Sequence, residues 1–159
     1  MQLTTHEPGF ESLDTLSDLE ALCVFVGEDE RPLRGIAGYL DWRMCGGLSR
    51  VLVSEFFQGA AGDCLLLPSH GRIAIPRVFV CGMGPLQGAR EQLGSLMTAA
   101  ADRLTRAKVR SVALELPQLP GLDETERVRV IRERFLPKFK GDRVAVLADK
   151  SVSRLLPST

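Results

Sequence analysis

The sequence has few of the residues that build common catalytic and metal centres. Its 159 residues include two histidines, four cysteines, one tryptophan and one tyrosine. The cysteines form no C-x-x-C pair, and no histidine stands at the spacing of a zinc finger. Cys23, Cys64 and Cys81 lie in apolar stretches, where a thiol behaves as a small hydrophobic group. The sequence therefore indicates structural thiols, and it predicts neither a metal site nor a cofactor.

Recognisable nucleophile patterns are also missing. Ser49 in GGLSR lacks the final glycine of the G-x-S-x-G elbow, and a hydroxyl at this position is typical of a helix start. His6 and His70 have no second donor at i+2 to i+4 that completes a ligand motif. Cys45 lies two residues after Arg43 in the sequence and is the alternative candidate for a nucleophile. We expect no catalytic residue in this chain.

The chain has no long hydrophobic run and no excess of charge of either sign. The first ten residues lack the basic and apolar regions of a secretory signal. No window reaches the ~18 apolar residues that a membrane-spanning helix needs, so we expect a cytoplasmic protein without a membrane partner. Twenty Lys and Arg balance twenty Asp and Glu. This balance argues against nucleic-acid binding driven by the charge of the whole domain.

Strand-like apolar runs alternate with amphipathic helical patterns along the chain. The predicted strands are residues 21–26, 64–67, 72–75, 77–81, 111–116 and 144–148, and an edge strand is allowed within 1–7. The predicted helices are residues 33–40, 48–56, 85–104, 123–135 and 151–156. The Pro and Gly of PSHG are expected to join 64–67 and 72–75 as a hairpin. This order favours one α/β domain over residues 1–159, a three-layer α/β/α sandwich with a mixed, largely parallel central sheet.

Several short motifs follow one another in an order that is more specific than any single motif. An acidic strand exit leads to a helix, a glycine and leucine break, a Phe before a G-x-x-G-D turn, a hairpin, and a strand that ends in G-x-G. Over residues 20–140 this order resembles the N-terminal domain of the leucyl (cytosol) aminopeptidases. The residues that carry the resemblance are Gly46, Gly47, Leu48, Phe57, Gly59, Gly62, Asp63, Arg77, Gly82 and Gly84.

The resemblance implies a macro-domain-like fold and an accessory role. In that family a separate catalytic domain follows, and its Lys, Asp and Glu side chains hold two metal ions. No matching segment is found in this chain, so no active-site residue of the family can be transferred to it. The resemblance therefore implies a stand-alone, non-catalytic module that acts through a protein partner or self-association. An exposed Trp42 would indicate such a contact surface.

The glycine turn after residues 77–81 supports an alternative function. Backbone N–H groups at a turn that opens a helix form an anion site, and the macro-like fold points to a nucleotide or ADP-ribose ligand. A tight strand-to-helix turn also needs glycine for steric reasons, and Gln87 occupies the place of the third glycine in G-x-G-x-x-G. An anion-binding role and a purely steric role for these glycines are both possible interpretations of the sequence. The candidate phosphate-binding residues are Gly82, Met83, Gly84 and Gly88.

A basic segment between residues 127 and 143 gives a further alternative, nucleic-acid binding. Seven Lys and Arg stand in it against Glu133 and Asp142. A solvated helix face would explain the same charges, and the aromatic residues that could stack on bases are limited to Phe135 and Phe139. The candidate contact residues are Arg127, Arg132, Arg134, Lys138 and Lys140.

Overall fold

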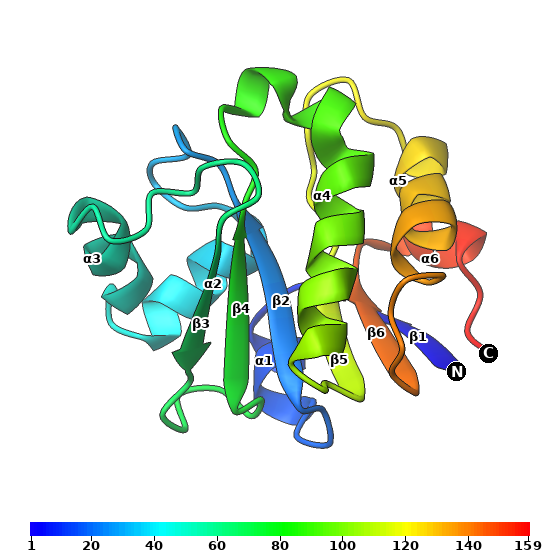
Figure 1. Cartoon of the computed structure of the whole chain (residues 1–159). Helices are drawn as coiled ribbons and strands as arrows, with labels where there is room; N and C mark the ends of the chain where they lie inside the picture. Colours follow the sequence, from blue (N-terminus) through cyan, green and yellow to red (C-terminus); the bar gives the residue numbers. More distant parts are fainter.

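A six-stranded sheet runs through the protein, of which the computed structural model describes residues 1–159. Its strands stand in the order β1-β6-β5-β2-β4-β3 (Figure 1). All neighbouring strands are parallel except β3, which pairs antiparallel with β4. The bounds of the strands are β1 Gln2–His6, β2 Ala21–Val26, β3 Cys64–Pro68, β4 Arg77–Gly82, β5 Ser111–Glu115 and β6 Arg143–Leu147.

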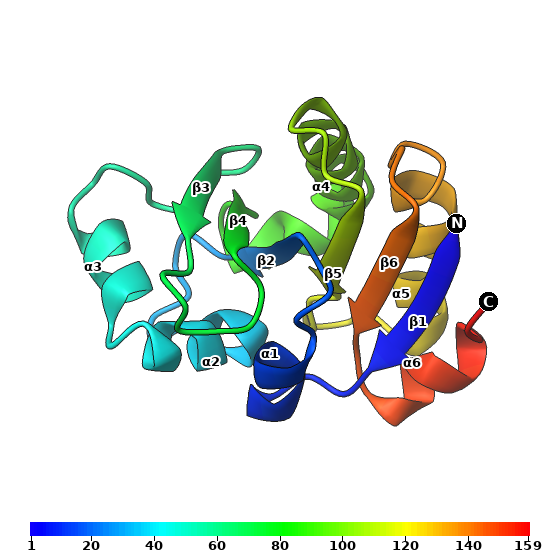
Figure 2. The ribbon, with the colours of Figure 1, turned by 90° about the horizontal axis from the view of Figure 1, so that it is seen from below.

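Helices cover both faces of the sheet (Figure 2). One layer holds α1 (Phe10–Thr15), α2 (Gly35–Arg43) and α3 (Gly47–Val53). The other holds α4 (Leu86–Arg106), α5 (Glu124–Val130), the π-helix η1 (Ile131–Phe135) and α6 (Lys150–Leu155). Alternate residues of β2 pack into the two layers, because successive side chains of a strand point to opposite faces. The predicted three-layer sandwich with a mixed, largely parallel sheet is confirmed.

Long or fully buried elements follow the sequence prediction closely. The strands at 21–26, 77–81, 111–116 and 144–148 are confirmed within one residue, and the edge strand near the N-terminus pairs with β6. The predicted capping box is present, since the N–H of Glu126 donates to Asp123 Oδ1 at 2.8 Å. None of the helices combines the length and the apolar character needed to cross a membrane.

The predicted strand at 72–75 is wrong. The partner of β3 in the hairpin is β4, and the residues between them form a loop. Ile73 and Ile75 are buried, which mimics the alternation of a strand. The N–H of Ala74, however, donates to the carbonyl of Leu13 in α1 at 2.9 Å. The segment therefore packs on α1 and does not join the sheet.

The helices differ from the sequence prediction in two places. The short helix α1 was not predicted, because its six residues give too little of a helical repeat to recognise. The helix expected at 48–56 ends at Val53. Phe56, expected on its apolar face, is 80% exposed, and the neighbouring Phe57 is buried in its place.

At the end of β4 the backbone of another segment lies very close to Gly82, and we predict that Gly82→Ala destabilises the protein. A Cβ at this residue would overlap the carbonyl oxygen of Ala60 and lie 2.7 Å from that of Gly59. Both atoms belong to backbone, so relief requires a shift of the loop. We expect the free energy of unfolding, measured by urea denaturation, to fall by about 3 kcal/mol.

Gly94→Ala in α4 is the matched control for this substitution. The nearest atom to its Cβ is Nε of the flexible Arg134 side chain at 3.2 Å, and alanine favours a helix over glycine by about 1 kcal/mol. Its stability should stay level or rise. Equal stabilities of the Gly82→Ala variant and the wild type would contradict the close packing of the loop on β4.

Candidate functional site

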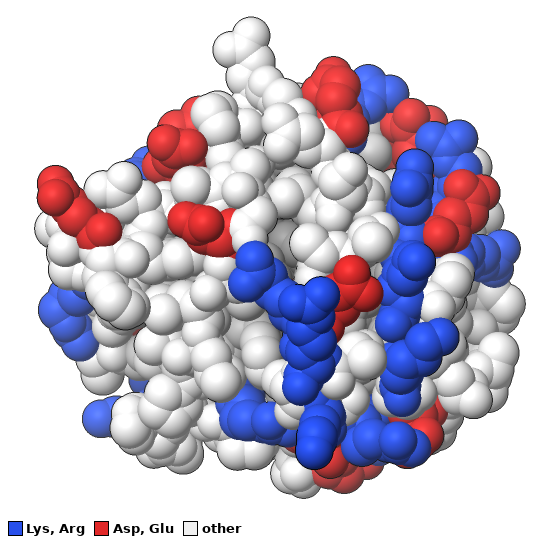
Figure 3. Space-filling model, in the orientation of Figure 1, with Lys and Arg blue, Asp and Glu red and all other residues white.

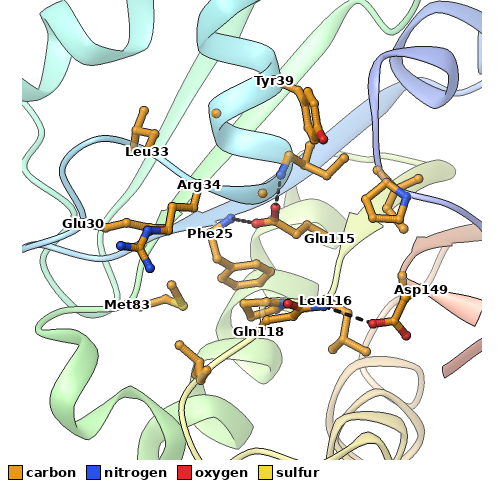
Figure 4. Close-up of a pocket in the computed structure, with 18 of the residues that line it drawn as sticks. Phe25, Glu30, Leu33, Arg34, Tyr39, Met83, Glu115, Leu116, Gln118 and Asp149 are labelled. Carbon is orange, nitrogen blue, oxygen red and sulfur yellow. Dashed lines mark hydrogen bonds between the residues drawn. The ribbon is translucent and has the colours of Figure 1, made fainter. Parts of the chain in front are cut away.

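A crevice of about 780 Å³ opens where the carboxyl ends of β2, β5 and β6 meet (Figure 4). After β2 the chain turns to α2 on one face of the sheet, and after β5 it continues to α5 on the other. This divergence of neighbouring parallel strands makes a topological switch point, where open α/β sheets bind ligands. The side chains that line it include Phe10, Phe25, Glu30, Arg34, Tyr39, Trp42, Met83, Leu86, Glu115, Leu116, Gln118, Leu119, Arg127 and Asp149.

The carboxylate of Glu115 forms the floor of the crevice. Hydrogen-bonded pairing of β2 with β5 stops at Cys23 and Leu114, and the Glu115 side chain fills the gap beyond. Its Oε1 accepts from the N–H of Phe25 at 3.0 Å, and its Oε2 accepts from the N–H of Ile36 at 2.8 Å. The second bond caps α2, whose own N-cap residue supplies no side-chain bond. One side chain thus joins β2, β5 and α2.

The environment of Glu115 favours its protonated form. Burial raises the pKa of this carboxyl to about 7, although the N–H donors of Phe25 and Ile36 oppose the rise. The negative charge of Glu30 adds to it. Functional sites often contain a carboxyl whose pKa is shifted toward neutral pH.

The opposite wall of the crevice is closed by a set of mutually bonded polar groups. The guanidinium of Arg127 donates to the carbonyl of Leu116 at 2.8 Å and lies 3.5 Å from Asp149 Oδ2. Gln118 donates to the same carboxylate at 3.0 Å. Hydrogen bonds from Ser151 lower the pKa of Asp149 most strongly, so it stays ionised beside the cation. These bonds fix the wall that follows β5 and β6.

Arg127 therefore does not lie where the sequence prediction placed it. It was predicted to contact nucleic acid, but only 4% of its surface is exposed and it forms part of the crevice wall. Arg132, Arg134, Lys138 and Lys140 are exposed. Figure 3 shows stripes of Lys and Arg on the face of the molecule on which α4 lies in Figure 1. Nucleic-acid contact by these four residues stays a prediction.

The glycine turn lies beside the crevice, but its N–H groups are already used. Those of Gly82, Met83 and Gly84 donate to the carbonyls of three residues elsewhere in the chain, at 2.8 to 2.9 Å; the acceptors are Asp63, Val26 and Gly59. Gly84 adopts a φ of +71°, which favours glycine. The turn thus offers no free N–H at these three residues for an anion. The buried side chain of Met83 lines the crevice, whereas Gly88 does not.

Histidines and cysteines do not contribute to the crevice. The Sγ atom of Cys81 lies 3.5 Å from that of Cys64 and 3.8 Å from that of Cys23. Hydrogen bonding to Cys81 and burial raise the pKa of Cys64, and hydrogen bonding to Cys23 and burial raise the pKa of Cys81, so both thiols stay protonated. His70 is exposed in the loop between β3 and β4. No group of three or more His, Cys, Asp or Glu side chains is arranged to hold a metal ion.

Glu115, Glu30 and Arg34 line the crevice but were not predicted as site residues from the sequence. The available signal was an acidic residue at the end of the apolar strand SVALE. A carboxylate in such a run is buried only if other groups bond to it, so the acidic residue indicates that other parts of the chain bond to it at the carboxyl end of β5.

Comparison with known proteins gives a consistent result. Residues 21–136 match the family model described as the cytosol aminopeptidase family, N-terminal domain. A probable cytosol aminopeptidase of Halorhodospira halophila is 35% identical over 115 residues, which cover 70% of this chain and 23% of that protein. Another, from Oleidesulfovibrio alaskensis, is 32% identical over 91 residues. The chain spans only 18% to 23% of the length of these relatives.

Solved structures share the fold at low identity. A mutant of tomato leucine aminopeptidase aligns with a TM-score of 0.65 and 17% identity, covering 98% of this chain and 34% of that one. The macrodomain of Mycobacterium tuberculosis DarG aligns with a TM-score of 0.67 and 14% identity, covering 92% of this chain and 98% of that one. These likenesses show a macro-like fold.

We predict that the Glu115 carboxyl gives the protein a pH-dependent stability. A raised pKa means that the folded state binds more protons than the unfolded state between pH 4.5 and about 7. The free energy of unfolding should therefore fall by about 3 kcal/mol as the pH rises through this range, and the contribution should be constant above it. Urea denaturation of the wild type and of Glu115→Gln at several pH values measures the difference.

The Gln variant keeps one acceptor oxygen but turns an NH₂ group toward a backbone donor, so it is less stable at acidic pH. Its deficit relative to the wild type should shrink as the pH approaches 7. Glu133→Gln, at an exposed residue, is the control and should leave the pH profile of the wild type unchanged. A constant difference between wild type and Glu115→Gln from pH 4.5 to 8 would show that this carboxyl is not buried.

Proposed function

Because the chain belongs to the N-terminal domain of the cytosol aminopeptidase family, we propose that it is an accessory module that acts by binding a small molecule. The observation that carries the proposal is the crevice of about 780 Å³ at the switch point between β2 and β5. Its volume lies within the roughly 300–1,000 Å³ of small-molecule sites. Its walls are largely apolar and enclose a few fixed polar groups, as such sites require.

The composition of the crevice supports binding rather than covalent catalysis. Its lining contains no Ser, Thr, Cys, Lys or His, the residues that most often act as nucleophile or base. Both oxygens of Glu115 accept backbone hydrogen bonds that hold the fold together. We therefore do not propose that these residues carry the aminopeptidase activity for which the relatives are named.

The same relatives are named cytosol aminopeptidases, which supports a cytoplasmic location as part of this proposal.

We predict that a small molecule binds in the crevice and stabilises the protein. A thermal-shift screen of amino acids, dipeptides, nucleotides and ADP-ribose, followed by calorimetry, identifies it; at about 100 times its Kd a ligand adds about 2.7 kcal/mol to the free energy of unfolding. Leu86→Trp fills part of the crevice and should weaken binding at least about tenfold.

The matched control for this prediction is Leu66→Trp. Leu66 is 51% exposed on the edge strand β3, outside the crevice lining, and this substitution should leave the affinity unchanged. Equal loss in both variants, or no ligand whose binding perturbs the N–H resonances of Phe25 and Met83, would refute the proposed site.

Contact with a protein is a second candidate function, supported by exposed apolar side chains. Val53 and Phe56, at and just beyond the end of α3, are 79% and 80% exposed, and Trp42 is 75% exposed at the crevice. Large apolar side chains on a surface are favoured anchors of protein interfaces. A second copy of the chain is the simplest partner, because a neutral net charge offers little repulsion between copies.

We predict that the protein self-associates through the end of α3. Sedimentation equilibrium should show a dimer whose dissociation constant rises at least about tenfold in Phe56→Ser, because hot-spot side chains contribute about 2 kcal/mol or more. Leu66→Ser is the control and should dimerise like the wild type. A monomer at all concentrations, or equal weakening in both variants, rules out this surface as the contact.

A further inference from the structure

Among the charged side chains of the crevice, Arg34 stands apart because it has no bonded partner. Glu115 is bonded to Phe25 and Ile36, and Arg127 and Asp149 are bonded to each other. Arg34 precedes the first residue of α2, is exposed, and forms neither a hydrogen bond nor an ion pair through its side chain. A guanidinium that lines a cavity without a partner is available to pair with an anionic group of a ligand.

A carboxylate lies on the same side of the crevice as this cation. The side chain of Arg34 extends toward the part of the cavity that carries Glu30 and Met83 (Figure 4). Glu30 is half-buried, and its Oε2 accepts from the N–H of Gly27 at 3.0 Å. Glu30 and Arg34 form no ion pair with each other. The crevice thus presents a cation and an anion side by side, each with bonding capacity left.

Most of the other residues that line the cavity are apolar, and several are aromatic. Phe25, Met83, Leu116 and Leu119 are buried in its wall. At the mouth the rings of Phe10 and Tyr39 pack edge to face with centroids 4.8 Å apart, next to the exposed ring of Trp42. A volume of about 780 Å³ leaves room for a side chain as large as that of tryptophan.

Resting on the proposed function, we infer that the crevice binds a free α-amino acid with a large aliphatic or aromatic side chain. Its carboxylate pairs with Arg34, its ammonium group pairs with Glu30, and its side chain lies against the apolar wall. A zwitterion satisfies both charges at once, so neither charge of the ligand is buried without a partner.

The same geometry disfavours a diphosphate ligand. The N–H groups of Gly82, Met83 and Gly84 are bonded within the protein, so no backbone cradle is left at this turn for a second anionic group. Glu30 lines the crevice without a cation bonded to it, and its carboxylate repels additional negative charge. We therefore expect tryptophan or leucine to bind more tightly than AMP or ADP-ribose, in contrast to the expectation from the fold alone.

Isothermal titration calorimetry with L-tryptophan and two of its derivatives tests the assignment. L-Tryptophanamide lacks the carboxylate and N-acetyl-L-tryptophan lacks the ammonium group, so each should bind at least about tenfold more weakly than L-tryptophan. Arg34→Gln should weaken L-tryptophan by a similar factor but leave the amide unaffected. Glu30→Gln should weaken L-tryptophan but leave the N-acetyl derivative unaffected.

Arg129→Gln is the matched control, because this exposed arginine of α5 lies outside the crevice and should bind L-tryptophan like the wild type. Equal affinities for L-tryptophan and both derivatives, or tighter binding of a dipeptide, overturn the inference. Binding of ADP-ribose or AMP in the crevice without any amino acid overturns it as well, while the proposed function stands. If none of these compounds binds, while the variants remain folded by circular dichroism, the inference fails together with the proposed small-molecule site.

Discussion

The carboxylate of Glu115 accepts hydrogen bonds from β2 and from the first turn of α2, and the arrangement of the crevice depends on this one group. Parallel strands that separate at a switch point leave backbone N–H groups without a strand partner. Here a side chain from β5 satisfies one of them at Phe25 and caps the following helix at Ile36. The same bonds hold α2 so that Arg34 and Tyr39 border the cavity.

This solution has a cost that a purely structural site would avoid. At neutral pH the buried carboxyl is close to its own pKa, so part of the population carries a buried negative charge that only backbone N–H donors stabilise. A hydrophobic residue at the same position could not cap α2. The fold therefore keeps a polar group at the point where the crevice meets the sheet.

The sequence predicts the layers of this fold well and its loops poorly. Strand β2 is apolar on both faces and α4 repeats its apolar positions over 21 residues, so both are recognisable locally. The loop at 72–75 alternates like a strand but is held by α1, a contact that joins residues about sixty positions apart. The binding partners of Glu115 lie 90 and 79 residues away. No local pattern contains such pairs, and for the same reason the burial of Arg127 beside Asp149 could not be predicted.

The arrangement of β2, β5 and α2 depends on a buried Glu115 carboxyl at the base of an open crevice. The most direct measurement is a ¹³C NMR titration of the side-chain carboxyl resonances of the intact protein between pH 3 and 9. We predict that the pKa of Glu115 is about 7, well above that of an ordinary glutamate at about 4.3. Titration of Glu115 near 4.3 would mean that water reaches this carboxyl freely, and it would contradict the arrangement of β2, β5 and α2 around it.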